Sequence, residues 1–143
     1  MMNRFNTARV LAGTSALGFF LAAGLHTSGY RQVVLRAQQG VGGSPMEVAA
    51  LWLAFAAALL LFGMMVALVA LRRVTGVGGR WVLALAGCFP LITVLLQLRF
   101  LGFIPPVVIL SAVAAVTFAA ALVWPAVSQG VATDKIVGEG GLR

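Results

Sequence analysis

Six polar side chains could act together in this chain, and all of them are predicted to lie at one membrane face. A histidine beside a carboxylate and several arginines can bind an anion, a metal ion or a lipid headgroup. One histidine and one glutamate are too few for a zinc site, which takes three or four protein ligands. The six residues of this candidate polar site are His26, Glu47, Gln97, Arg99, Arg31 and Arg36.

A purely structural interpretation explains the same residues, and it is the favoured one. Ser44 can cap a helix that begins at Pro45, with Glu47 as its capping-box partner. Arg99 is then an interface anchor and His26 an interfacial side chain. The hypothesis that remains to be tested is that His26 and Glu47 lie at the same face and close enough to affect each other.

Other residues are weaker candidates for a functional site. Met64, Met65 and Cys88 carry the soft sulfur that Cu(I) prefers, but they lack a Met-x-Met or Cys-x-x-Cys spacing and are predicted to fill the core. Ser111 and Thr117 have no histidine or acid nearby, so their hydroxyls are expected to bond backbone carbonyls one turn back. No phosphate loop, zinc-protease or hydrolase motif occurs. We expect a non-enzymatic protein without catalytic residues, cofactor or metal.

The elements that must position these residues are four apolar segments. The 143 residues are 62% hydrophobic and 9% charged, with a mean hydropathy of +1.06. A helix needs about 20 apolar residues to cross a bilayer. The sequence predicts an all-α, integral-membrane four-helix bundle within residues 1–125, with antiparallel up-down spans over about 9–30, 46–71, 80–98 and 105–124. Pro90 is predicted to kink the third span. Residues 126–143 are predicted to form a flexible tail.

Small residues recur at helical spacing in the first two spans. Such residues let helix backbones approach closely, either inside one bundle or between two copies of a chain. Packing within the bundle is favoured over a dimer interface, because every span must pack somewhere. The residues are Thr14, Gly18, Ala22 and His26 in the first span, and Ala56, Gly63, Ala67 and Ala70 in the second.

The net charge of +7 predicts contact with lipid phosphates, not with nucleic acid, because the basic residues sit at span ends. Cytoplasmic termini place seven basic residues inside and three outside, which fits the positive-inside rule. The inner seven are Arg4, Arg9, Arg72, Arg73, Arg80, Lys135 and Arg143, and the outer three are Arg31, Arg36 and Arg99. This predicts a multi-pass protein of the bacterial cytoplasmic (inner) membrane.

Three functions fit this pattern. The leading hypothesis is an accessory or structural membrane component that contacts lipids and either a membrane-protein partner or a second copy. The alternative is a subunit of a small oligomeric transporter or channel, with a path between subunits. The least favoured is an enzyme acting on a lipid headgroup at the outer polar residues. No motif identifies a substrate or a partner.

Overall fold

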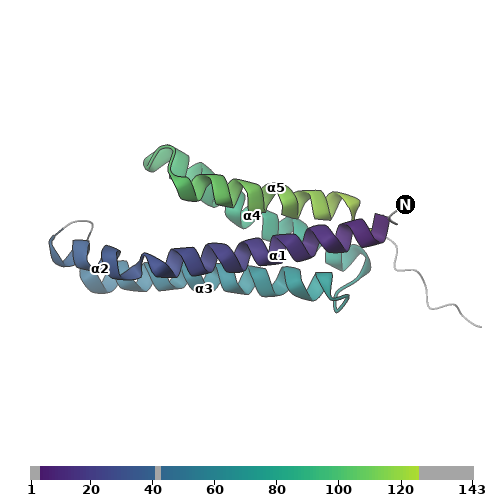
Figure 1. Ribbon diagram of the computed structural model, residues 1–143, viewed down its shortest axis with the longest axis horizontal. Coiled ribbons are helices and arrows are strands. Elements are labelled where there is room, and N and C mark those ends of the chain that lie inside the picture. Colours follow the sequence, from purple (N-terminus) through teal and green to yellow (C-terminus); the bar gives the residue numbers. More distant parts are fainter. Residues whose placement is uncertain (1–3, 41–42, 126–143) are drawn as a thin grey trace, which may run out of the picture.

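The computed structural model describes residues 4–40 and 43–125, and within them it contains helices and no strands. Figure 1 shows their arrangement. The predicted tail at 126–143 lies outside the described residues. The helices are α1 (Arg4–Ser28), α2 (Tyr30–Gln38), α3 (Pro45–Ala70), α4 (Gly76–Phe100) and α5 (Pro105–Val123).

Within the described residues, four helical stretches are long and apolar enough to cross a membrane. The first combines α1 and α2 into 35 residues, Arg4–Gln38, and so extends past both ends of the predicted 9–30 segment. Gly29 joins the two helices with a helical backbone conformation, φ −79° and ψ −10°. The segment from Arg31 to Arg36 therefore continues the line of α1 as a further helix. The other three stretches are α3, α4 and α5.

The start of α3 follows from its local sequence. The Ser44 hydroxyl accepts a hydrogen bond from the Glu47 backbone N–H at 3.3 Å, and the Ser44 backbone N–H donates to Glu47 Oε2 at 3.4 Å. Pro45 occupies the first helical position. These bonds satisfy backbone donors that have no partner inside the helix. The predicted cap is confirmed.

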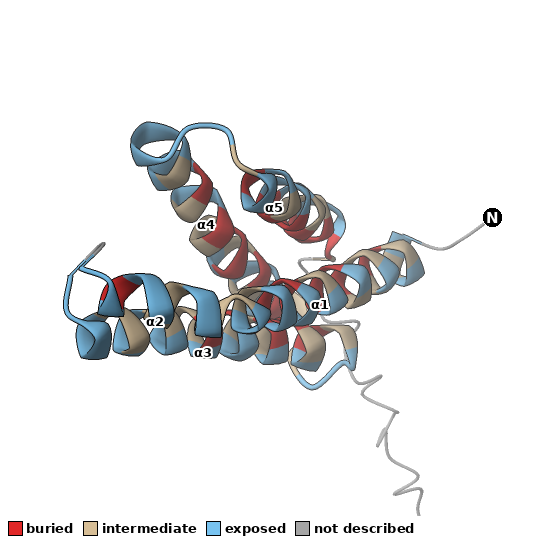
Figure 2. Cartoon of the chain, turned by 60° about the vertical axis from the view of Figure 1, so that its left-hand side comes forward, coloured by how far each residue is buried: buried red, intermediate tan, exposed pale blue. Residues whose placement is uncertain are grey.

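The helix α1 lies between α3 and α5, and α4 packs mainly on α5. Contacts at the helix ends define the arrangement. The start of α1 meets the end of α3, where Arg9 bonds the carbonyl of Ala70, and it also meets the end of α5, where Phe5 contacts Trp124. The end of α1 meets the start of α3, where His26 contacts Trp52. Figure 2 shows the buried residues on the facing sides of the helices.

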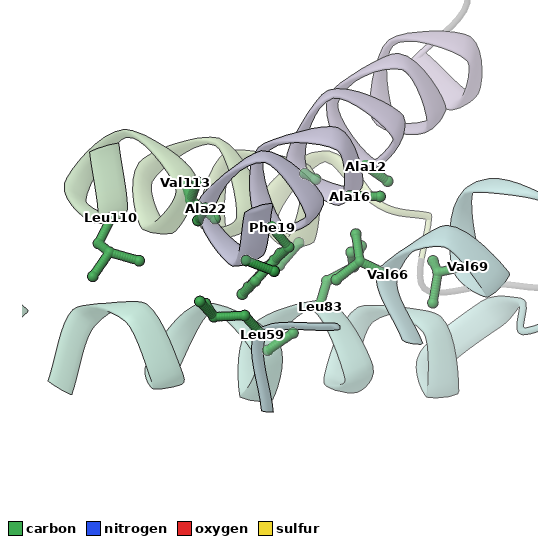
Figure 3. Packing of buried hydrophobic residues seen from close by; sticks show 14 of the residues in the cluster. Ala12, Ala16, Phe19, Ala22, Leu59, Val66, Val69, Leu83, Leu110 and Val113 are labelled. Carbon is green, nitrogen blue, oxygen red and sulfur yellow. The ribbon is translucent and has the colours of Figure 1, made fainter. Parts of the chain in front are cut away.

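The core depends on small side chains in α1. Figure 3 shows Ala12, Ala16 and Phe19 of α1 among core residues of the neighbouring helices. Small side chains allow close approach of helix backbones. Of the small residues singled out in the sequence, Ala22, Ala56 and Gly63 are buried inside the chain, whereas Thr14 is exposed. The buried residues of α1 are Ala8, Ala12, Ser15, Ala16, Phe19, Ala22 and Ala23.

Phenylalanine rings fill the space between α3 and α4, which make fewer contacts with each other than α4 makes with α5. Phe89 of α4 lies 5.5 Å from Phe55 and 4.6 Å from Phe62, measured between ring centroids. Phe62 also stacks on Phe19 of α1 at 6.3 Å. These rings connect α4 to the α1–α3 pair. Pro90 follows directly and is buried within α4, which is helical on both sides of it.

Two adjacent glycines at the start of α4 give a matched test of close packing. A Cβ atom on Gly79 would lie 2.7 Å from Trp124 Nε1 and 3.2 Å from the carbonyl oxygen of Val74, whereas one on Gly78 would meet only a Val74 methyl at 3.7 Å. We expect Gly79→Ala to lower the free energy of unfolding by about 1–3 kcal/mol, the usual cost of overpacking. Gly78→Ala should be neutral or slightly stabilising. Denaturant titration in detergent measures both, and equal effects would contradict this packing.

Candidate functional site

His26 lies in an aromatic environment on α3. Its ring stacks on Trp52 with centroids 3.9 Å apart and an interplanar angle of 15°, and it tilts against Phe55 at 4.8 Å. His26 Nε2 lies 3.1 Å from the Trp52 carbonyl oxygen, and Trp52 Nε1 donates to the His26 carbonyl oxygen at 2.8 Å. A carbonyl oxygen only accepts hydrogen bonds, so Nε2 carries the proton. His26 therefore joins the end of α1 to the first turns of α3.

Glu47 is exposed and bonds to Ser44 within its own helix cap. No hydrogen bond or ion pair joins it to His26 in the described part of the chain. Glu47 precedes Trp52 by five residues, which corresponds to about 7.5 Å along the helix axis. The two residues are thus at the same end of the α1–α3 pair, but each has its own partners.

The remaining four residues divide between two places. Arg31 and Arg36 are exposed on α2, which packs on α3. Gln97 and Arg99 are at the end of α4, where the Arg99 guanidinium lies 5.6 Å from the Phe100 ring centroid. Figure 1 shows α2 and the start of α3 reaching past the turn between α4 and α5. In the described part of the chain, the six residues therefore lie in separate places and do not form one cluster.

Gln97 differs from the other five because its side-chain oxygen is buried. Gln97 Oε1 has no hydrogen-bond partner among the described residues. A buried acceptor without a donor costs about 1–3 kcal/mol. The described residues also contain no group of three His, Cys, Asp or Glu side chains that could hold a metal ion.

A buried hydroxyl pair at mid-span is a feature that the sequence analysis missed in part. Ser15 Oγ on α1 lies 2.5 Å from Thr117 Oγ1 on α5, and Thr117 donates to the Val113 carbonyl oxygen at 2.6 Å. The predicted bond of Thr117 one turn back is confirmed. Ser15 was not identified, although its spacing from Ala8, Ala12 and Phe19 places it on the same buried face. Each hydroxyl has a partner, so this pair links two helices.

A second polar region lies at the opposite end of the bundle. Arg9 Nε donates to the Ala70 carbonyl oxygen at 3.0 Å. An open hollow of about 510 Å³ lies beside it, lined by Asn6, Arg9, Val10 and Ala70. The Arg72 guanidinium lies 4.4 Å from the Phe5 ring centroid. The sequence predicts that these arginines contact lipid phosphates and set the orientation of the chain, but only the structure brings Arg9 to the end of α3.

Comparison with known proteins finds no matching family model, no matching curated protein and no matching solved structure.

The structure predicts that His26 is energetically coupled to Trp52 and independent of Glu47. In a double-mutant cycle, His26→Ala and Trp52→Leu should show a coupling of about 1 kcal/mol, because both remove the same ring contact. His26→Ala and Glu47→Ala should add within about 0.5 kcal/mol. Glu47→Ala alone should cost about 1 kcal/mol as the loss of a cap. Unfolding in detergent of the wild type, the three single variants and the two double variants provides the free energies for both cycles. Strong coupling between His26 and Glu47 would instead support a polar pair.

Proposed function

We propose that this chain is a small polytopic protein of the bacterial inner membrane that acts without catalysis. It serves as an accessory or structural component through contacts with lipids and with a protein partner. Its spans form an antiparallel up-down bundle, and both termini are cytoplasmic.

The membrane setting is supported by helix length and by the outer surface. The shortest span, α5, has 19 residues, or about 28 Å of helix, close to the roughly 30 Å thickness of the hydrocarbon core. Large apolar side chains point outward on several helices. Leu17 is 70% exposed, Leu85 is 62% exposed and Leu122 is 75% exposed. Water disfavours an apolar surface of this extent, whereas lipid chains accept it.

The antiparallel arrangement is supported by the contacts between opposite helix ends, such as Arg9 with Ala70 and His26 with Trp52. The turn between α4 and α5 is short, with Gly102 at φ +74°, as expected for neighbouring helices that reverse direction. Pro90 has no N–H to bond the carbonyl of Ala86, so we propose that α4 bends at this position.

The observation that carries the non-catalytic proposal is the content of the bundle interior. Among the described residues, Ser15 and Thr117 are the buried polar residues at mid-span and they bond to each other, whereas the buried unpaired atoms, Gln97 Oε1 and Trp124 Nε1, lie at the ends of α4 and α5. Mid-membrane transport and catalytic sites usually contain ionisable groups or unpaired polar groups. Here the arginines, His26 and Glu47 lie toward the helix ends, so the surfaces and ends of the bundle remain available for function.

The projecting helix α2 is the surface best placed to meet a protein partner. It carries exposed polar residues, among them Arg31, Gln32 and Arg36, and it extends beyond the α4–α5 turn. The alternative of an oligomeric transporter requires a hydrated path at mid-depth, and no feature of the described interior favours one.

Cysteine labelling tests both the membrane topology of the chain and the accessibility of its interior to water. In a Cys88→Ala background, a membrane-impermeant thiol reagent applied to intact cells should label Gln39→Cys but not Thr75→Cys. Thr75→Cys should react in inverted vesicles, because the two positions lie on opposite sides of the proposed membrane. Ala86→Cys, at a fully buried position in mid-helix, should stay unlabelled in both preparations. Rapid labelling of Ala86→Cys would support the transporter hypothesis. Labelling of Thr75→Cys in intact cells would show that the chain has the opposite orientation to the one proposed.

Site-specific photo-crosslinking tests the partner contact. A photoreactive residue at Gln32 on α2 should give one discrete protein adduct in intact cells, whereas one at Leu95, on an outward apolar face of α4, should give lipid adducts only. Both positions are exposed, so exposure alone does not explain a difference. The same protein adduct from both positions, or none from Gln32, would argue against a partner at α2.

A further inference from the structure

Five arginines gather at the end of the bundle opposite to α2, without an acid to neutralise them among the described residues. Contacts of α1 place them there, because Arg9 reaches Ala70 at the end of α3 and Phe5 lies under Arg72. Glu47 is the only acidic residue in 4–40 and 43–125, and it lies at the other end. A negatively charged ligand would complement this region. The five are Arg4, Arg9, Arg72, Arg73 and Arg80.

Arg9 is held in a position suited to an anion. Its Nε donates to the Ala70 carbonyl oxygen, one of the carbonyls that a helix end leaves without an internal partner. The bond fixes the guanidinium group through Nε and uses neither of its terminal nitrogens. Two parallel N–H groups in this arrangement match the oxygens of a phosphate. The hollow lined by Asn6, Arg9, Val10 and Ala70 provides space beside them.

Arg72 occupies a backbone position that normally favours glycine. Its φ is +62°, and the bonds from Arg72 N to Val69 O at 3.0 Å and from Arg73 N to Leu68 O at 2.9 Å close the end of α3 in a Schellman motif. Glycine would adopt this conformation without strain. An arginine there instead places a guanidinium group on the Phe5 ring, at the start of α1. The backbone conformation would be satisfied by glycine, so it does not explain why residue 72 carries a positive charge.

We propose that this hollow binds the phosphate of an anionic phospholipid, with an acyl chain along α1. Asn6, Val10, Leu17 and Leu21 follow one another at helical spacing, so an exposed face leads from the hollow toward mid-span. Val10 is 58% exposed, Leu17 is 70% exposed and Leu21 is 60% exposed. A phospholipid would contact Arg9 with its headgroup and this apolar face with an acyl chain, whereas a soluble anion would contact only Arg9.

Basic pockets between helices on the cytoplasmic side are suited to anionic lipid headgroups. The inference rests on the membrane setting proposed above and on no particular cellular role. The labelling experiment tests that setting separately, so a correctly inserted protein without a lipid preference would overturn the lipid site alone.

The test measures lipid binding to the purified full chain in neutral detergent, with native mass spectrometry as the detection method. Phosphatidylglycerol is compared with phosphatidylcholine carrying the same acyl chains. Both lipids carry a phosphate that Arg9 can bind, but the positive choline group of phosphatidylcholine is repelled by the surrounding arginines, so we expect phosphatidylglycerol to bind roughly tenfold more tightly. Inorganic phosphate at millimolar concentration should not displace the lipid. Equal binding of the two lipids, or displacement by phosphate, would overturn the proposal.

Variants locate the site. Arg9→Gln should reduce the preference for phosphatidylglycerol several-fold. Arg72→Gly should do the same while keeping the α3 end folded, because glycine suits its backbone conformation. Arg36→Gln, which removes the same charge from exposed α2, should change affinity by less than about twofold, since charges far apart are screened. An equal loss in Arg36→Gln would show that overall charge, and not this hollow, attracts the lipid.

Discussion

The small side chains along α1 let two other helices, α3 and α5, pack against it at close range. In lipid there is little hydrophobic gain from bringing helices together, so association depends on close van der Waals contact and on bonds between helices. The alanines of α1 provide the first and the Ser15–Thr117 bond provides part of the second. The attachment of α4 to α5 then completes the bundle, with phenylalanine rings filling the space toward α3.

Two hydrogen bonds join α1 to α3, one at each end of the helix pair. Trp52 bonds the carbonyl of His26 near the end of α1, and Arg9 bonds the carbonyl of Ala70 at the end of α3. The Arg9 bond satisfies a carbonyl at the end of α3, whereas the His26 carbonyl also accepts from the Gly29 backbone N–H, so Trp52 provides a second donor there.

The two ends nevertheless differ in what they offer to other molecules. One end carries the projecting helix α2 with the stacked His26 and Trp52 rings at its base. The other end carries five arginines without an acidic neighbour among the described residues, and one of them, Arg9, lines an open hollow. We propose a protein contact at the first end and an anionic lipid at the second. Such a division would let the chain hold a partner on one side of the membrane while lipid charge fixes its depth and orientation from the other side.

The sequence by itself determined the properties that depend on neighbours along the chain. Apolar segments of sufficient length produced four helical stretches, and Ser44, Pro45 and Glu47 produced the cap of α3, because these effects act within a few residues. Only the tertiary structure decided how each helix is rotated about its axis. That rotation places His26 on Trp52 without a bond to Glu47, joins Ser15 to Thr117, and brings Arg9 to the end of α3. Helical period and charge indicate which residues share a face or an end of a helix, but the partner that each one meets depends on packing between residues far apart in the chain.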